Sequence, residues 1–106
     1  MSTVYLMRSP LASCFRHDKT VGFVSMRGTE CVFFDGSLAE LAHEVWTRLP
    51  TPVERSSLIA ELSSVGNKED AIENVLSGLL RDKLILSDDE ARLAQILRRP
   101  SLEELG

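Results

Sequence analysis

The sequence predicts an α+β fold, because segments typical of strands come first and amphipathic helices follow. Residues 20–35 have the composition of a β-hairpin, and later segments carry apolar residues at helical spacing. Strands and helices that are segregated along a chain favour α+β over an alternating parallel fold. A three-stranded antiparallel sheet followed by three helices is the winged-helix arrangement. We expect it here as one domain over residues 1–106, with its core at about residues 15–86.

The predicted hairpin has two apolar faces. A two-residue turn at Gly28-Thr29 would pair Met26 with Cys31 and Val24 with Phe33. The two faces would carry Phe23, Val32 and Phe34 on one side, and Val24, Met26, Cys31 and Phe33 on the other. An antiparallel sheet that covers a core on one face is normally polar on its solvent face. The second apolar face therefore indicates a partner, or a cover made by the N-terminal segment, the C-terminal helix or a second copy.

Two segments before the hairpin complete the strand prediction. Residues 13–18 are expected to form a strand that turns at Asp18-Lys19. Residues 4–6 either add an edge strand or pack against the rest of the fold. A short closing strand is expected at residues 84–86.

Four helix starts follow from capping patterns. Three pairs of residues have the spacing of a capping box, and a fourth helix follows an asparagine; these are Ser37 with Glu40, Thr51 with Glu54, Ser87 with Glu90, and Asn67. The first helix should end near Pro50 and the second near Gly66. The last helix, about residues 88–98, belongs to an additional segment at residues 87–98.

Charge and composition exclude several functions. The net charge of −4 argues against nonspecific binding to nucleic acid or to an anionic membrane. No segment approaches the length of a membrane span, and two cysteines are too few for a disulfide framework, so we expect a cytoplasmic protein. The side chains that could form a zinc site, Cys14, His17, Cys31 and His43, lack two closely spaced pairs. No glycine-rich phosphate loop or catalytic triad is present, so we expect neither an enzyme nor a cofactor.

DNA binding is the alternative function of a winged helix. The third helix would then enter the major groove with its N-terminal half. That half carries Glu69, Asp70 and Glu73 against Lys68 alone. Phosphate contacts require the opposite charge, so a DNA-binding regulator is the second hypothesis.

Several sequence segments resemble the PqqD-like proteins, the precursor-recognition elements of pathways that modify ribosomally made peptides. The resemblance covers about residues 15–86. It is carried by Val21-Gly22-Phe23-Val24, Glu30-Cys31-Val32-Phe33-Phe34-Asp35, the helix through Trp46, Thr51-Pro52, and the segment from Ile72 to Leu86. Lys83 stands where the family frequently has a glycine after the third helix.

The resemblance implies a non-catalytic adaptor. Such a domain binds the leader of a precursor peptide as an additional strand, between the last strand of its sheet and the third helix. It then delivers the peptide to a modifying enzyme, such as a radical-SAM protein or a cyclodehydratase. Transferred to this sequence, the peptide-binding residues are Glu30, Cys31, Val32, Phe33, Phe34, Glu69, Glu73, Leu76 and Leu80.

Three further expectations accompany this adaptor function. The acidic third helix predicts a leader with lysine or arginine near its apolar anchors. The protein is expected to be a monomer or a weak dimer, and a homodimer through the apolar hairpin face is a rival use of that face. The C-terminal helix either docks the enzyme or covers the peptide groove.

Overall fold

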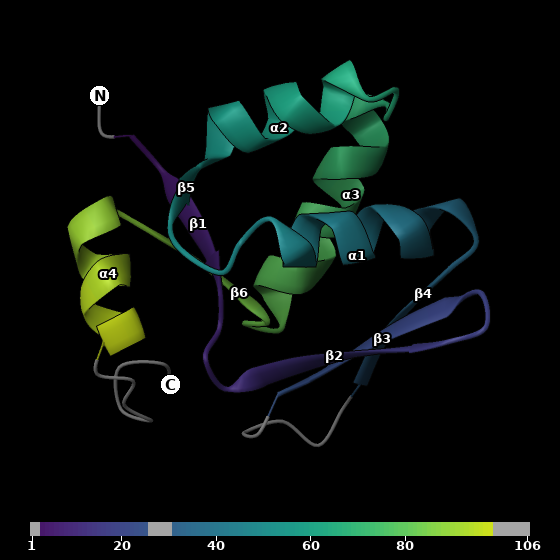
Figure 1. Ribbon diagram of the computed structural model, residues 1–106, viewed down its shortest axis with the longest axis horizontal. Helices are drawn as coiled ribbons and strands as arrows, with labels where there is room; N and C mark the ends of the chain where they lie inside the picture. The colour runs from purple at the N-terminus through teal and green to yellow at the C-terminus, as the bar shows by residue number, and fades with distance from the viewer. Residues whose placement is uncertain (1–2, 26–30, 99–106) are drawn as a thin grey trace.

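The computed structural model describes residues 3–25 and 31–98, which form an α+β fold with four helices and two three-stranded antiparallel sheets (Figure 1). The strands are β1 (Tyr5–Arg8), β2 (Ala12–His17), β3 (Thr20–Ser25), β4 (Cys31–Asp35), β5 (Val53–Glu54) and β6 (Ile85–Asp88). The helices are α1 (Ser37–Thr47), α2 (Arg55–Ser64), α3 (Glu69–Arg81) and α4 (Glu90–Arg98). The predicted α+β class is confirmed.

The first sheet has the order β2-β3-β4 and contains the predicted hairpin. His17 pairs with Thr20 across the turn at Asp18-Lys19, as expected. Asp18 has a φ of 55°, a left-handed conformation that aspartate tolerates better than most residues. The β2-β3-β4 sheet is therefore a meander of three sequential strands.

The register of β3 and β4 differs from the prediction by two residues. Val24 pairs with Cys31 and Phe23 with Val32. Because side chains alternate with a period of two, a shift of two residues keeps each side chain on its predicted face. Met26, Glu30 and the predicted turn lie outside the described residues. The predicted faces are thus correct for the residues described, although the pairing is not.

A second sheet, in the order β5-β1-β6, corrects the expectation of one sheet. The N-terminal segment is its central strand, because β1 pairs with β5 on one side and β6 on the other. Val53 and Glu54 were expected within the second helix, but they are extended and pair with Leu6 and Tyr5. The pairing explains why α2 begins only at Arg55. The closing strand also runs later than predicted, over β6.

The helix starts differ from the predicted capping boxes. Gly36, with a φ of 62°, precedes α1, and no side chain caps that helix. The side-chain amide of Asn67 donates to the carbonyl of Leu62 at 2.9 Å, so it closes α2 instead of opening α3. At α4 the Asp89 carboxylate accepts a hydrogen bond of 2.7 Å from the backbone N–H of Arg92. Asp89 is therefore the N-cap residue of this helix, in place of the predicted Ser87.

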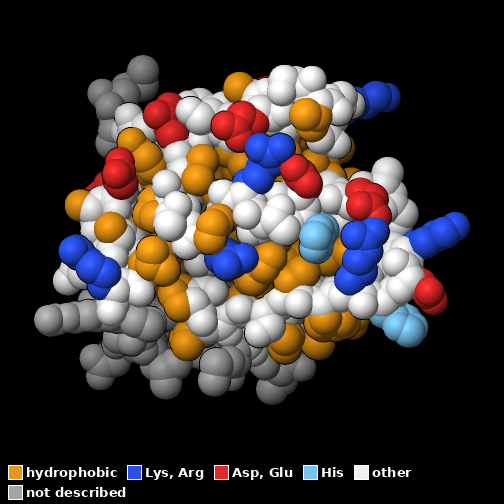
Figure 2. Space-filling model, in the orientation of Figure 1, with side chains coloured by type: hydrophobic (Ala, Val, Ile, Leu, Met, Phe, Trp, Pro, Cys, Tyr) orange, Lys and Arg blue, Asp and Glu red, His pale blue; other side chains and the backbone are white. Residues whose placement is uncertain are grey.

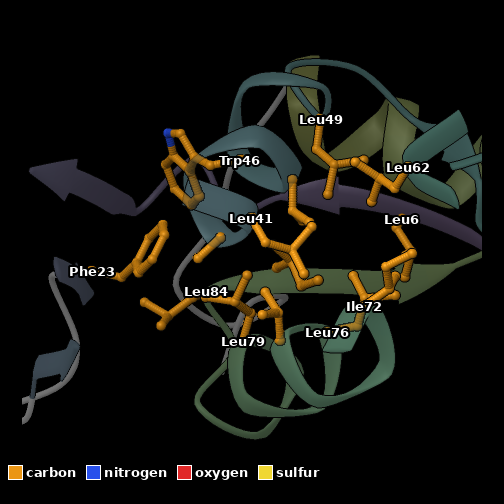
Figure 3. Close-up of a cluster of buried hydrophobic side chains, with 14 of the residues drawn as sticks. Leu6, Phe23, Leu41, Trp46, Leu49, Leu62, Ile72, Leu76, Leu79 and Leu84 are labelled. Carbon is orange, nitrogen blue, oxygen red and sulfur yellow. The ribbon is translucent and has the colours of Figure 1, made fainter. Parts of the chain in front are cut away.

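The main core lies between the helices and the inner face of the β2-β3-β4 sheet. α1 packs against β3, β4 and α3. Phe23 of β3 faces Trp46 of α1 with ring centroids 5.4 Å apart, and the leucines of α3 extend the cluster to Leu6 of β1 (Figure 3). One apolar core therefore joins both sheets.

A smaller cluster fixes the C-terminal helix. Met7, Leu93 and Ile96 are buried together and attach α4 to β1 and β6. Figure 1 shows α4 and β4 at opposite ends of the molecule. Of the two roles expected for this helix, covering the groove at β4 is excluded by its position.

Candidate functional site

The outer edge of β4 carries no other strand within residues 3–25 and 31–98. β4 pairs with β3 from Thr20–Asp35 to Val24–Cys31 and ends the strand order of its sheet. An edge strand presents backbone N–H and C=O groups that have no partner in the sheet. These groups can pair with an additional strand from another chain.

Side chains of β4 alternate between the core and solvent. Val32 and Phe34 pack against the main core, and the ring of Phe34 makes an edge contact with Phe23 at 5.9 Å. Cys31 is exposed and Phe33 is 55% exposed on the opposite face. A hydrophobic side chain as open as Phe33 is available to a ligand that lies along this edge.

Phe33 belongs to an exposed aromatic pair that spans the sheet. Its ring meets Phe15 of β2 edge-on, with centroids 5.9 Å apart, and Phe15 is 43% exposed. Gly22 of β3 is paired with both residues. A Cβ atom at Gly22 would overlap the Phe15 ring, so the ring covers the glycine directly. We call Phe15, Val24, Cys31 and Phe33 the outer patch.

The described chain leaves the outer patch uncovered. The N-terminal strand β1 lies in the other sheet, and α4 packs on that sheet as well. Hydrophobic side chains reach the surface along the lower part of the molecule, over the β2-β3-β4 sheet (Figure 2). Of the covers considered from the sequence, the N-terminal strand and α4 are excluded.

Helix α3 approaches β4 with the face that contains Gly78. A Cβ atom at Gly78 would lie 3.3 Å from the tip of the Phe34 ring. Residues at helical spacing from Gly78, namely Ala71, Asn74 and Arg81, share this face. Asn74 and Arg81 are exposed, and Ala71 packs at the border of the core. We call these four residues the Gly78 face; together with the β4 edge they form the candidate site.

The α3 residues proposed from the sequence lie on the opposite side of the helix. Glu69, Glu73, Leu76 and Leu80 form a stripe about half a turn from the Gly78 face. Leu76 is 1% exposed and points into the core near Leu6 and Ile72 (Figure 3). This corrects the expectation that Leu76 contacts a ligand. Leu80 also packs against the core.

Glu73 is engaged by an ion pair with another helix. Arg55, the first residue of α2, donates to both carboxylate oxygens of Glu73 at 2.6 Å. Glu69 is exposed, and it lies on the same far side of α3. Glu69 and Glu73 therefore face α2 and solvent away from β4, so these two carboxylates do not support the expectation of a basic leader.

The two cysteines lie on opposite faces of the sheet. Cys14 packs against the core, whereas Cys31 is exposed on the outer patch. Burial raises the pKa of the Cys14 thiol, and the charge of Arg8 lowers it by a smaller amount. No group of three or more metal-binding side chains comes together in the described part of the chain.

The residues missed from the sequence include Gly78, Asn74 and Phe15. Gly78 within a helical pattern signals a close approach of backbone to a neighbour, and it could have identified the correct face of α3. Asn74 follows from the same spacing. Phe15 could have been found only from the pairing of β2 with β3, because it lies next to Phe33 through Gly22.

No protein-family model, curated protein or solved structure matches the chain. Membership of the PqqD-like family therefore stays a prediction from the sequence pattern. Among the described residues, no helix has both the length and the hydropathy that crossing a bilayer requires.

Proposed function

We propose that this protein binds an extended peptide as a fourth strand on β4 and acts as a non-catalytic adaptor. The peptide would be the leader of a ribosomally made precursor, which the adaptor presents to a modifying enzyme. The observation that carries the proposal is the edge of β4, which pairs with no further strand of the described residues and has exposed Phe33 on one side and the Gly78 face of α3 on the other.

The geometry suits a short extended ligand. β4 has five residues, so a paired segment of similar length would extend for about 17 Å. Alternate ligand side chains would contact Phe33 on the outer face, and the others would lie between Phe34 and Asn74. Backbone pairing supplies affinity for any sequence, while the side-chain contacts select among peptides.

The order of elements supports the adaptor and its winged-helix-like arrangement. Three sequential antiparallel strands, β2 to β4, are followed by α1, α2 and α3. This is the order that the PqqD-like resemblance implies, with the third helix beside the last strand. The β5-β1-β6 sheet and α4 are additions on the far side, where they leave the β4 edge open.

Selection from a displayed library of random peptides, followed by affinity measurement, tests the proposal. Phe33→Asp places a charge at the centre of the site, and Val65→Asp is the matched control because Val65 is 64% exposed after α2. We expect selected peptides to bind the Phe33→Asp protein at least about tenfold more weakly, a loss of about 1.4 kcal/mol. Unchanged affinity for Phe33→Asp, or an equal loss for Val65→Asp, contradicts the proposal.

Two rival functions predict different results with the same protein. A DNA-binding regulator would bind labelled duplex tightly and with steep salt dependence; exposed Glu69 and Asp70 in the first turn of α3 disfavour this outcome. A homodimer through the outer patch would sediment as a stable dimer at micromolar concentration, and Phe33→Asp would dissociate it. Either result replaces the adaptor.

A further inference from the structure

A recess of about 460 Å³ lies on the side of the molecule away from β4. It is bounded by the corner between β1 and β2, the end of α1, and the last turn of α4. Its lining includes Arg8, Ser13, Cys14, Trp46, Pro50 and Leu97. The volume is within the range of pockets that hold small molecules or a few residues of a peptide.

Arg8 supplies a positive charge that is held in place but not neutralised. Its guanidinium carbon lies 5.5 Å from the centroid of the Trp46 ring, a cation–π arrangement that fixes the side chain. Within the described residues, no carboxylate lies within ion-pair distance of Arg8. By contrast, Arg16, Arg48 and Arg55 each pair with a glutamate from another part of the chain. The guanidinium N–H groups of Arg8 can therefore donate hydrogen bonds to an anion from outside the described residues.

The other walls of the recess indicate which groups a ligand would carry beside its anion. Pro50 and Leu97 line the recess together with Arg8 and present apolar surface. A guanidinium group binds a carboxylate through two parallel hydrogen bonds. The net charge of −4 disfavours a polyanion such as nucleic acid. An acidic residue beside an apolar residue matches both kinds of wall.

We propose that this recess binds an acidic side chain of a peptide, with Arg8 as the anchor and the adjacent apolar residue of the peptide against Pro50 and Leu97. The site is next to β2, at the edge of the sheet opposite β4. It is therefore independent of strand addition, and the two sites can be occupied at the same time by one partner or by two.

The two cysteines allow a direct test. Cys14 lines the recess and Cys31 is exposed on the outer patch, so alkylation of each thiol can be followed by mass spectrometry in one sample. The probe is acetyl-Leu-Glu-Leu-amide at millimolar concentration, with acetyl-Leu-Gln-Leu-amide as its neutral counterpart. A bound carboxylate would block access to Cys14 and oppose the charge of Arg8, which promotes the reactive thiolate.

We expect the glutamate peptide to slow alkylation of Cys14 at least about threefold, as two-thirds occupancy requires, without changing the rate at Cys31. The glutamine peptide should have no effect. Arg8→Gln removes the anchoring charge and should remove the protection, whereas Lys68→Gln, which removes the same charge at an exposed site before α3, should retain it. Equal protection by both peptides, no protection by either, or equal protection by inorganic phosphate alone overturns the assignment.

Discussion

Two glycines set the positions of aromatic rings in the candidate site. At Gly22 the Phe15 ring occupies the space where a side chain would begin. At Gly78 the missing side chain lets α3 approach the ring of Phe34. The outer patch thus depends on the absence of a Cβ atom at Gly22, whereas a Cβ atom at Gly78 would be a tight fit against Phe34.

Replacement of Gly22 by alanine tests the first of these contacts. The new methyl group would overlap the Phe15 ring, which must move and lose its edge contact with Phe33. We expect Gly22→Ala to lower the free energy of unfolding by about 1 kcal/mol. In a Phe15→Ala background the same change should cost nothing, so a double-mutant cycle measured by urea unfolding should give a coupling of similar size. Equal effects in both backgrounds would show that the ring does not cover the glycine.

At this scale the sequence predicts side-chain faces well and side-chain partners poorly. The alternation along β4 placed Phe33 outside and Phe34 inside, because a strand has a fixed period of two. Glu73 was expected at the ligand, but its partner Arg55 comes from another helix. Lys83 adopts a φ of 56° after α3, a left-handed conformation that glycine adopts most readily at the end of a helix. These features depend on long-range pairing or backbone geometry that spacing alone does not reveal.

Helix α3 has two sides with different neighbours. Its far side holds Glu69 and Glu73 and contacts α2 through Arg55, while the Gly78 face lies beside the edge of β4. We therefore expect substitutions on the Gly78 face to affect peptide binding and substitutions on the far side to leave it unchanged.

Bulky substitutions distinguish the two sides of α3. Asn74→Trp would fill the space between the Gly78 face and β4, and we expect the affinity for a selected peptide to fall at least about tenfold. Glu69→Trp makes the same change at an exposed position on the far side, and it should change the affinity less than about twofold. Fluorescence anisotropy with labelled peptide measures both. The opposite ranking would restore the acidic side of the helix as the binding face.

Helix α4 is attached to β1 by an interaction that titrates. A hydrogen bond to Glu90 and the charge of Glu90 raise the pKa of Tyr5 above its ordinary value of 10.0. The folded state therefore favours the neutral phenol. The contribution of this interaction to the free energy of unfolding is complete below pH 10.0, and it is lost as the pH rises through the raised pKa of Tyr5.

The chain has a single tyrosine, so an ultraviolet absorbance titration reports this group alone. We expect Glu90→Gln to lower the pKa of Tyr5 toward its ordinary value. Identical titration curves for the two proteins would show that Glu90 does not act on Tyr5.

The sequence predicts most elements by their periodicity and misses those that need a distant partner. The apolar stripes of α1, α3 and α4 identify these helices, since each stripe is local. β5 has only two residues and exists because it pairs with β1. The capping patterns at Thr51 and Ser87 predict helix starts that are three and two residues too early, and the pattern at Ser37 predicts a side-chain cap that α1 does not have. Neighbouring strand and turn contacts set these boundaries instead.

At the scale of the whole molecule, the two sheets have different roles. The β5-β1-β6 sheet joins both ends of the chain and carries α4 on its own small cluster. Within residues 3–25 and 31–98, the β2-β3-β4 sheet keeps an open edge and an apolar outer face. No local pattern could show this division, because β1 and β6 are far apart in the sequence. We propose β4 as the edge to which a fourth strand is added.

Isotope-filtered nuclear Overhauser spectroscopy tests that claim most directly. Labelled protein and an unlabelled selected peptide would show which strands are adjacent in the complex. We predict cross-strand contacts between backbone protons of the peptide and those of Cys31–Asp35, with further contacts to Asn74 and Gly78. A bound peptide that shows no backbone contact with β4 would contradict it.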